Sequence, residues 1–187
     1  MADLSLTAIS YVVLGLVDAL GRATPYEMKR VVAGSIGYFW PFPHSQLYAE
    51  PTRLAEAGLL REDQEESGRR RKTYTITPSG RTALEEWILR GEAELSEIRD
   101  LGLLQLFFAS RLPADAISDL ARRHEALHRE RLAEYEDLYR RIERGVPPAM
   151  VATLRMGVRF EHMAIDFWAG IAADPPVDRP APSGAEG

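Results

Sequence analysis

The chain has 187 residues, of which 45% are apolar and 27% are charged, and its formal net charge is −5. This composition is typical of a globular protein with enough apolar side chains for a packed core, in one large domain or two small ones. The absence of cysteine excludes disulfides and thiol chemistry. Apolar runs fall well short of the roughly 18 residues of a membrane helix, and the start of the sequence lacks the basic segment of a secretory signal, so we expect a cytoplasmic location.

The charge is divided unevenly along the chain. Residues 1–90 contain 11 Lys and Arg against 11 Asp and Glu, whereas residues 91–187 contain 12 against 17. Because binding to a nucleic acid depends on local potential, a neutral first half with a concentrated cationic segment can still bind phosphates. The acidic second half is a better candidate for self-association or ligand sensing.

Two helix signals open the chain. Apolar residues at helical spacing predict a first helix over residues 6–20, ended by Gly21. Thr24 and Glu27 form a capping-box pattern with a proline in the first turn, which predicts a second helix to about residue 33. A loop over residues 34–43 follows. It carries three aromatic residues that we expect to pack on their own domain: Tyr38, Phe39 and Trp40.

A third, amphipathic helix is expected from Ser45, its N-cap, to Ala57, closed by Gly58. Its apolar face should pack on the first two helices. The opposite face is expected to be free to enter a groove, and it carries Gln46, Ala49, Glu50 and Arg53. A proline at position 51 removes a backbone hydrogen bond, so we expect a bend or a tightened turn near residues 47–51.

Two strands, at about residues 59–64 and 72–77, flank a polar turn with four consecutive cations. These are Arg69, Arg70, Arg71 and Lys72. Thr77 and Pro78 then open a fourth helix to about residue 90, again with a cap followed by proline. A helix, a strand, a basic turn and a second strand in this order are typical of a winged helix-turn-helix that binds DNA.

From about residue 97 the pattern is helical. It comprises an apolar stripe that ends before Pro113, a long helix over about 114–144, and a last helix over about 149–172. The last helix is apolar on two sides, so we expect a partner subunit to cover one of them. The sequence therefore predicts a mainly α protein with a small β-wing. Its parts are a winged helix-turn-helix DNA-binding domain (1–92), an antiparallel helical dimerisation and effector domain (97–173), and a disordered tail (174–187).

His124, Glu125 and His128 match the H-E-x-x-H pattern that places two zinc ligands on one helix. Charged flanks and the lack of a third ligand at the usual spacing favour a chance match. A zinc-dependent hydrolase is thus one alternative function, and a winged-helix module for protein contacts is another. We predict no catalytic residue, no metal site, no cofactor and no enzymatic activity.

Several short motifs follow one another in a recognisable order. They are Tyr26-Glu27, Ser45-Gln46-Leu47-Tyr48, residues 53–59, 69–74 and 77–80, and Leu104-Gln105-Leu106-Phe107-Phe108. As a set they resemble the PadR-like transcriptional regulators, in particular the longer members with a helical C-terminal dimerisation domain. The resemblance implies a homodimer and usually repression, released by a small molecule that is often aromatic. It also implies DNA contacts by Tyr26, Gln46, Tyr48, Arg70 and Arg71.

We therefore predict a dimeric regulator that binds a pseudo-palindromic operator in double-stranded DNA. Arginine pairs bidentately with guanine and glutamine with adenine, so Arg53 and Gln46 are expected to read base edges. The predicted DNA-binding residues are Tyr26, His44, Ser45, Gln46, Tyr48, Ala49, Arg53, Arg69, Arg70, Arg71 and Lys72.

The C-terminal helices supply two further sets of candidates. The predicted dimerisation residues are Leu104, Phe107, Leu120, Leu127, Leu132, Tyr135, Leu154, Val158, Ile165 and Trp168. The predicted effector residues are Phe108, Met156, Arg159, Phe160 and Met163, for which a plain dimer core is the alternative.

Overall fold

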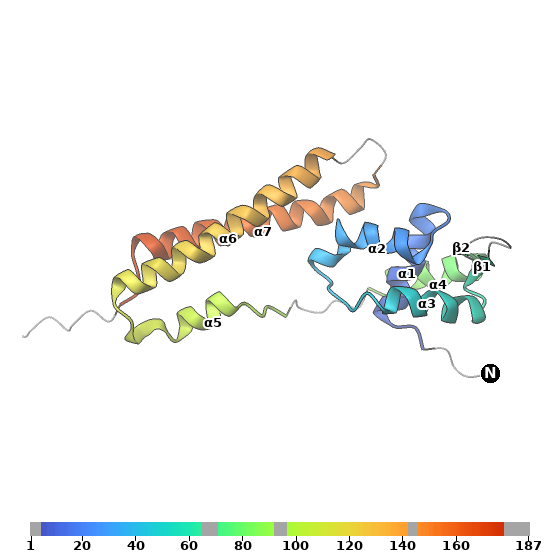
Figure 1. Cartoon of the computed structure of the whole chain (residues 1–187), viewed down its shortest axis with the longest axis horizontal. Helices are drawn as coiled ribbons and strands as arrows, with labels where there is room; N and C mark the ends of the chain where they lie inside the picture. Colours follow the sequence, from blue (N-terminus) through green and yellow to red (C-terminus); the bar gives the residue numbers. More distant parts are fainter. Residues whose placement is uncertain (1–4, 65–70, 92–96, 142–145, 178–187) are drawn as a thin grey trace, which may run out of the picture. The chain divides into compact units, whose positions relative to one another are not determined.

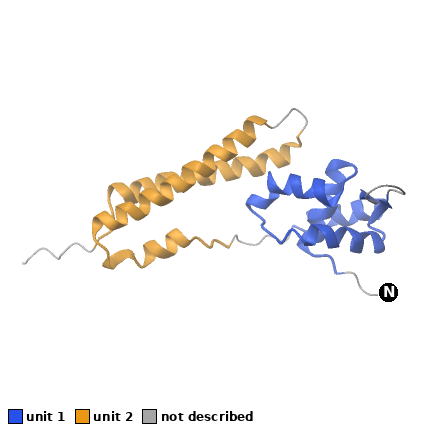
Figure 2. Cartoon of the chain, in the orientation of Figure 1, with its two compact units in different colours: residues 1–95 blue, residues 96–187 orange. Residues whose placement is uncertain are grey.

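The computed structural model describes residues 5–64, 71–91, 97–141 and 146–177, and it divides into two compact units (Figure 2). Unit 1 spans residues 1–95 and unit 2 spans residues 96–187. The fold is mainly helical with a small antiparallel sheet, as the sequence predicts. Among the helices of the described segments, none is long and apolar enough to cross a membrane.

Unit 1 begins with two helices whose ends are set by their capping residues (Figure 1). Helix α1 (Ala8–Leu20) ends at Gly21, and α2 (Pro25–Ala33) starts after Thr24. The Thr24 N–H donates to the Glu27 carboxylate at 2.8 Å, and the Glu27 N–H donates to Thr24 Oγ1 at 3.2 Å. The predicted capping box is therefore confirmed. A short 3₁₀ turn, η1 (Ile36–Tyr38), lies in the loop that follows.

The rest of unit 1 is helix α3 (Gln46–Glu56), strands β1 (Leu60–Gln64) and β2 (Lys72–Ile76), and helix α4 (Pro78–Arg90). The strands pair in antiparallel register from Leu60 opposite Ile76 to Gln64 opposite Lys72. Tyr74 also exchanges two backbone hydrogen bonds with Ala23, at 3.0 and 2.8 Å. This bridge ties the turn between α1 and α2 to the wing.

One apolar core holds the elements of unit 1 together. All of them except η1 and α4 contribute buried side chains to it: Val13, Leu14, Leu16, Val17, Met28, Val32, Leu47, Leu54, Leu60, Tyr74 and Ile76. Helix α4 packs against the core through the half-buried Leu84. Its Trp87 stacks on Tyr11 of α1, with ring centroids 4.5 Å apart. Phe39 and Trp40 are exposed, so the expectation that the loop aromatics pack on their domain is wrong for these two.

Unit 2 contains helix α5 (Leu101–Phe107), the 3₁₀ turn η2 (Ala109–Arg111), and the long helices α6 (Ala114–Arg141) and α7 (Pro148–Ala173). Helices α6 and α7 lie side by side as an antiparallel pair (Figure 1). Helix α5 approaches them closely at Gly102, where an added Cβ would lie 2.6 Å from the His124 ring and 2.8 Å from that of Trp168. The predicted tail begins at Asp174, and its residues 178–187 lie outside the described residues.

The two apolar faces of α7 have different surroundings. Trp168, Ile165 and Ala164 are buried within unit 2, and Trp168 is only 1% exposed. The other face is exposed on the protomer, and it carries Met156, Phe160, Met163 and Phe167. Four of the predicted dimerisation residues are buried inside the protomer: Ile165 and Trp168 on this face of α7, and Leu120 and Tyr135 on α6. Their burial needs no partner subunit, so the structure does not favour their predicted role in the dimer interface.

Candidate nucleic-acid interface

The first turn of α3 has exposed residues around one buried leucine. Leu47 is fully buried in the core, whereas Ser45, Gln46, Tyr48 and Ala49 around it are exposed. An exposed helix turn of this kind has the dimensions to enter a major groove. Two further predicted contact residues are also exposed: His44, just before α3, and Tyr26, in the first turn of α2.

The backbone is tightened at the start of this turn, earlier in the chain than most of the range, residues 47–51, where the proline at position 51 led us to expect it. The N–H groups of Gln46, Leu47 and Tyr48 donate to carbonyls three residues earlier rather than four, at 3.0 to 3.1 Å. Ser45 does not act as a side-chain cap, because its backbone is already helical and its hydroxyl makes no capping hydrogen bond. The Ser45 capping prediction is therefore wrong, and its hydroxyl remains available at the exposed end of the helix.

The wing carries its cations beside acidic partners. Arg71 Nη2 lies 3.3 Å from the Glu27 carboxylate, and Lys72 Nζ lies 2.8 Å from that of Glu62. Hydrogen bonds from the Thr24 backbone and hydroxyl lower the pKa of Glu27, and the hydrogen bond from Lys72 lowers that of Glu62. Both carboxyls are therefore charged at neutral pH. Arg69 and Arg70, the other two predicted wing cations, lie outside the described residues.

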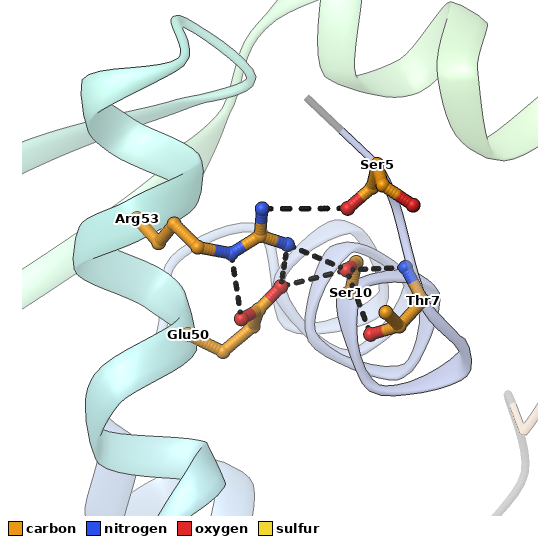
Figure 3. A network of polar contacts seen from close by, with 5 residues as sticks. All are labelled: Ser5, Thr7, Ser10, Glu50 and Arg53. Atoms are coloured by element: carbon orange, nitrogen blue, oxygen red, sulfur yellow. Dashed lines mark hydrogen bonds and ion pairs between the residues drawn. The ribbon is translucent and has the colours of Figure 1, made fainter. Parts of the chain in front are cut away.

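Glu50 and Arg53 do not lie as the helical periodicity suggested. Glu50 is 9% exposed, and its carboxylate accepts from Ser10 Oγ at 2.6 Å (Figure 3). It also accepts from Arg53 Nε at 3.0 Å and Nη2 at 2.6 Å. The expectation that Glu50 is on a free face is wrong. The Arg53 guanidinium is engaged by Glu50 and by Ser10, so the structure does not favour its predicted role in reading a base edge.

The same contacts keep both groups ionised. Burial raises the pKa of Glu50, but the hydrogen bonds from Arg53 and Ser10 and the charge of Arg53 together hold it below its usual range. The hydrogen bond to Glu50 raises the pKa of Arg53. Sequence reasoning missed Ser10, whose hydroxyl is fully buried between the two helices. The sequence feature that could have identified Ser10 is its position as a polar residue among the apolar residues of the first helix.

The histidines of the H-E-x-x-H pattern contact protein groups. The His124 ring stacks on Trp168 with centroids 4.7 Å apart, and His128 Nδ1 lies 2.6 Å from Glu161 Oε2. Glu125 pairs with Arg129 at 2.6 Å. Within the described residues, no three His, Cys, Asp or Glu side chains are grouped as metal ligands. The pattern thus supports packing between α6 and α7.

The predicted effector residues do not line one pocket. Phe108, Met156 and Met163 are exposed, and Phe160 is 37% exposed. Arg159 lines a groove of about 480 Å³ between α6 and α7 without the other four. Of the predicted dimerisation residues, Leu104, Phe107 and Leu127 are exposed on the protomer. Leu132, Leu154 and Val158 are half-buried.

Comparison with known proteins extends over both units. The model of the PadR-like family of transcriptional regulators matches residues 13–86, and that of the virulence activator alpha C-terminal region matches residues 98–171. The chain is 31% identical over 172 residues to the probable transcriptional regulator Rv1176c of Mycobacterium tuberculosis, with 79% of this chain and 87% of the relative covered. It is 26% identical over 142 residues to the negative transcriptional regulator PadR of Bacillus subtilis, with 75% and 78% covered.

Solved structures share the fold. Bacillus subtilis PadR in complex with operator DNA matches with a TM-score of 0.79 and 24% identity, over 89% of this chain and 98% of that one. The same protein in complex with p-coumaric acid matches with a TM-score of 0.74 and 22% identity, over 90% and 97%.

The relatives are transcriptional regulators rather than enzymes, so the zinc-hydrolase alternative is set aside. The family match covers the helices and the wing of unit 1, and the 31% identical relative extends the likeness along most of the chain. The chain belongs to the PadR-like family of DNA-binding transcriptional regulators.

Proposed function

We propose that the protein binds a pseudo-palindromic operator as a homodimer. The first turn of α3 would lie in the major groove, and the wing would lie along the sugar-phosphate backbone of the DNA. The observation that carries this proposal is the exposed turn at Ser45 to Ala49, held on the buried Leu47. Two such turns related by a two-fold axis would meet half-sites about 34–36 Å apart, or a multiple of that spacing. The protein would do so in the cytoplasm of a bacterial-type cell.

The side chains divide into those that read bases and those that position the duplex. Gln46 is the candidate for base readout, because its amide can pair bidentately with adenine and it leads the exposed turn. Phosphate contacts are proposed for Tyr26, His44, Ser45, Tyr48, Arg69, Arg70, Arg71 and Lys72, with Ala49 against an apolar base edge.

In the protein without DNA, Arg71 of the wing pairs with the carboxylate of Glu27 in α2 instead of with a phosphate. Both side chains are about half exposed, so their ion pair contributes little to folding. Arg71 can therefore exchange the carboxylate for a DNA phosphate at small cost.

Dimerisation is assigned to the exposed apolar face of α7, formed by Met156, Phe160, Met163 and Phe167. A row of large apolar side chains on one helix face is typical of a surface that a partner covers. The exposed residues of α5, Leu104 and Phe107, extend the apolar surface available to that partner.

Repression released by a small molecule is the proposed mode of regulation. The relative named as a negative regulator supports repression, and the PadR complex with p-coumaric acid supports a small aromatic effector. The groove beside Arg159 is also lined by Arg140, Arg155, Tyr139, Val158 and one carboxylate, Glu136. Three arginines against one carboxylate leave a net positive charge that suits an organic anion, so we propose this groove as the effector site in place of the five residues predicted from the sequence.

Two variants test the DNA assignment on a duplex selected from a random pool by the wild-type protein. Replacing Arg70 and Arg71 by alanine should weaken binding to all sequences and lower the salt slope by about 0.9 for each phosphate that is no longer neutralised. Gln46→Ala should mainly relax sequence preference, by roughly 1–3 kcal/mol at one base pair. Fluorescence anisotropy at several salt concentrations measures both effects.

Intact operator affinity in both variants would show that the groove assignment is wrong. Absence of any salt-dependent DNA binding by the wild-type chain would instead support the protein-interaction alternative.

A further inference from the structure

A polar network buried between α1 and α3 contains one side chain that the sequence suggested as a DNA contact and two that cannot reach DNA (Figure 3). Ser10 is fully buried and Glu50 is nearly so, whereas the Arg53 side chain is 36% exposed. Polar groups at this depth destabilise a fold unless their hydrogen bonds are satisfied. Here the Glu50 carboxylate receives three hydrogen bonds, from Ser10 and twice from Arg53.

The Glu50–Arg53 pair spans a gap in the backbone hydrogen bonding of α3. Between them lies Pro51, which has no N–H to donate to the carbonyl of Leu47. In the turn before it, the N–H groups of residues 46–48 donate to carbonyls three residues earlier, and the Ala49 N–H donates to the Ser45 carbonyl four residues earlier, at 3.3 Å. One backbone constraint on the angle between this turn and the rest of the helix is therefore missing. Two charge-assisted hydrogen bonds between side chains on either side of the proline supply that constraint.

The network is anchored outside α3, at the start of α1. Ser10 Oγ accepts from the Thr7 N–H at 2.9 Å and from Arg53 Nη2 at 3.0 Å. Arg53 Nη1 also donates to the carbonyl of Ser5 at 3.4 Å. Figure 3 shows the guanidinium directed from α3 toward these groups. The orientation of α3 is thereby tied to the cap of α1.

We propose that Ser10, Glu50 and Arg53 are positioning residues for DNA recognition, which hold the first turn of α3 at the tilt it needs in the major groove. This inference rests on the proposed DNA-binding function. It assigns Arg53 an indirect role: the arginine acts on the operator through Glu50 and Ser10 and not by pairing with a base.

The test compares Ser10→Ala, Glu50→Gln and Arg53→Lys in the full chain, on the selected duplex and on an unrelated one. Each variant should lose about tenfold in affinity for the selected duplex, because each removes part of one buried network. The salt slope should stay unchanged, since no phosphate contact is removed. The double variant E50Q/R53K should lose little more than either single one, because the two residues act as a unit.

Ile76→Val is the matched control, because it removes a core methylene of unit 1 without touching the network. Hydrogen exchange in the absence of DNA supplies a second readout. Glu50→Gln should raise the exchange rates of the amides of residues 46–49 by about tenfold relative to those of α1, whereas Ile76→Val should not.

Two results would overturn the inference. One is an Arg53→Lys variant that loses sequence preference while Ser10→Ala and Glu50→Gln bind like the control, since Arg53 would then contact DNA itself. The other is unchanged exchange at residues 46–49 in Glu50→Gln. Failure of the proposed function is distinguishable, because the wild-type chain would then bind no duplex although its exchange pattern still depended on Glu50.

Discussion

At the scale of single residues, the carboxyl of Glu50 links folding to pH. Its pKa in the folded protein lies below the ordinary value of 4.5, because hydrogen bonds from Arg53 and Ser10 outweigh the effect of burial. A carboxyl with a lowered folded pKa stabilises the fold fully above its unfolded pKa, and this stabilisation is lost as pH falls through the folded value. The carboxyls of Glu27 and Glu62 have pKa shifts of the same sign.

We therefore expect the midpoint of thermal unfolding to fall as pH is lowered from about 5 toward 3. Glu50→Gln should be less stable than the wild type at pH 7 and should lose less stability over this range. Circular dichroism melts at several pH values measure both differences. Glu86→Gln, on the exposed side of α4, is the control and should follow the wild type. If Glu50→Gln also follows the wild-type curve, the carboxyl does not contribute.

At the scale of elements, glycine fixes how closely α4 approaches the strand region. A Cβ added at Gly80 would lie 2.1 Å from the backbone carbonyl of Leu59, which cannot move aside as a side-chain tip could. The Gly80 N–H also donates to Thr77 Oγ1 at 3.1 Å, which caps the helix. The start of α4 is thus held against the chain that enters β1.

Gly80→Ala should therefore destabilise unit 1 by about 1–3 kcal/mol, because the helix must move away from the strand. Gly15→Ala is the matched control, since Gly15 is inside α1 with no atom within 4 Å of an added Cβ. It should stabilise by roughly 0.5–1 kcal/mol through helix propensity. Urea unfolding of both variants measures the contrast, and equal stabilities would contradict the close approach.

Local signals predicted the elements well where one residue decides the outcome. Thr24 with its following proline, and Thr77 with its own, set the starts of α2 and α4 as the sequence suggested. The contacts of α3 were harder to predict. Helical periodicity shows which residues share a face of the helix, but it does not show which of them contact α1. The contact of Glu50 with Ser10 joins residues 40 apart, which no local pattern records.

At the scale of the whole molecule, the packing of α7 was also hard to predict from the sequence. Both of its faces are apolar, so the sequence alone did not decide which one packs on α6. The structure buries the face with Trp168, whose ring stacks on His124 and packs beside Gly102. The opposite face, with Met163 at its centre, is exposed on the protomer, and it is the face that we propose a partner subunit covers.

Met163→Asp should consequently weaken self-association by about 2 kcal/mol or more, because it places a charge in the proposed interface. Operator affinity should fall with it, since two half-sites must be bound together. His162→Asp, on the neighbouring exposed position, is the matched control and should stay dimeric. Sedimentation equilibrium decides the outcome, and an unchanged dimer in Met163→Asp would exclude this face.

The hydrogen bond from Arg53 to the carbonyl of Ser5 has a practical consequence for anyone producing the protein. This bond holds Ser5 beside the helix that is proposed to enter the groove. We therefore expect a purification tag at the N-terminus to weaken recognition while leaving the fold intact. Affinities are therefore best measured on material tagged at the far end of the chain.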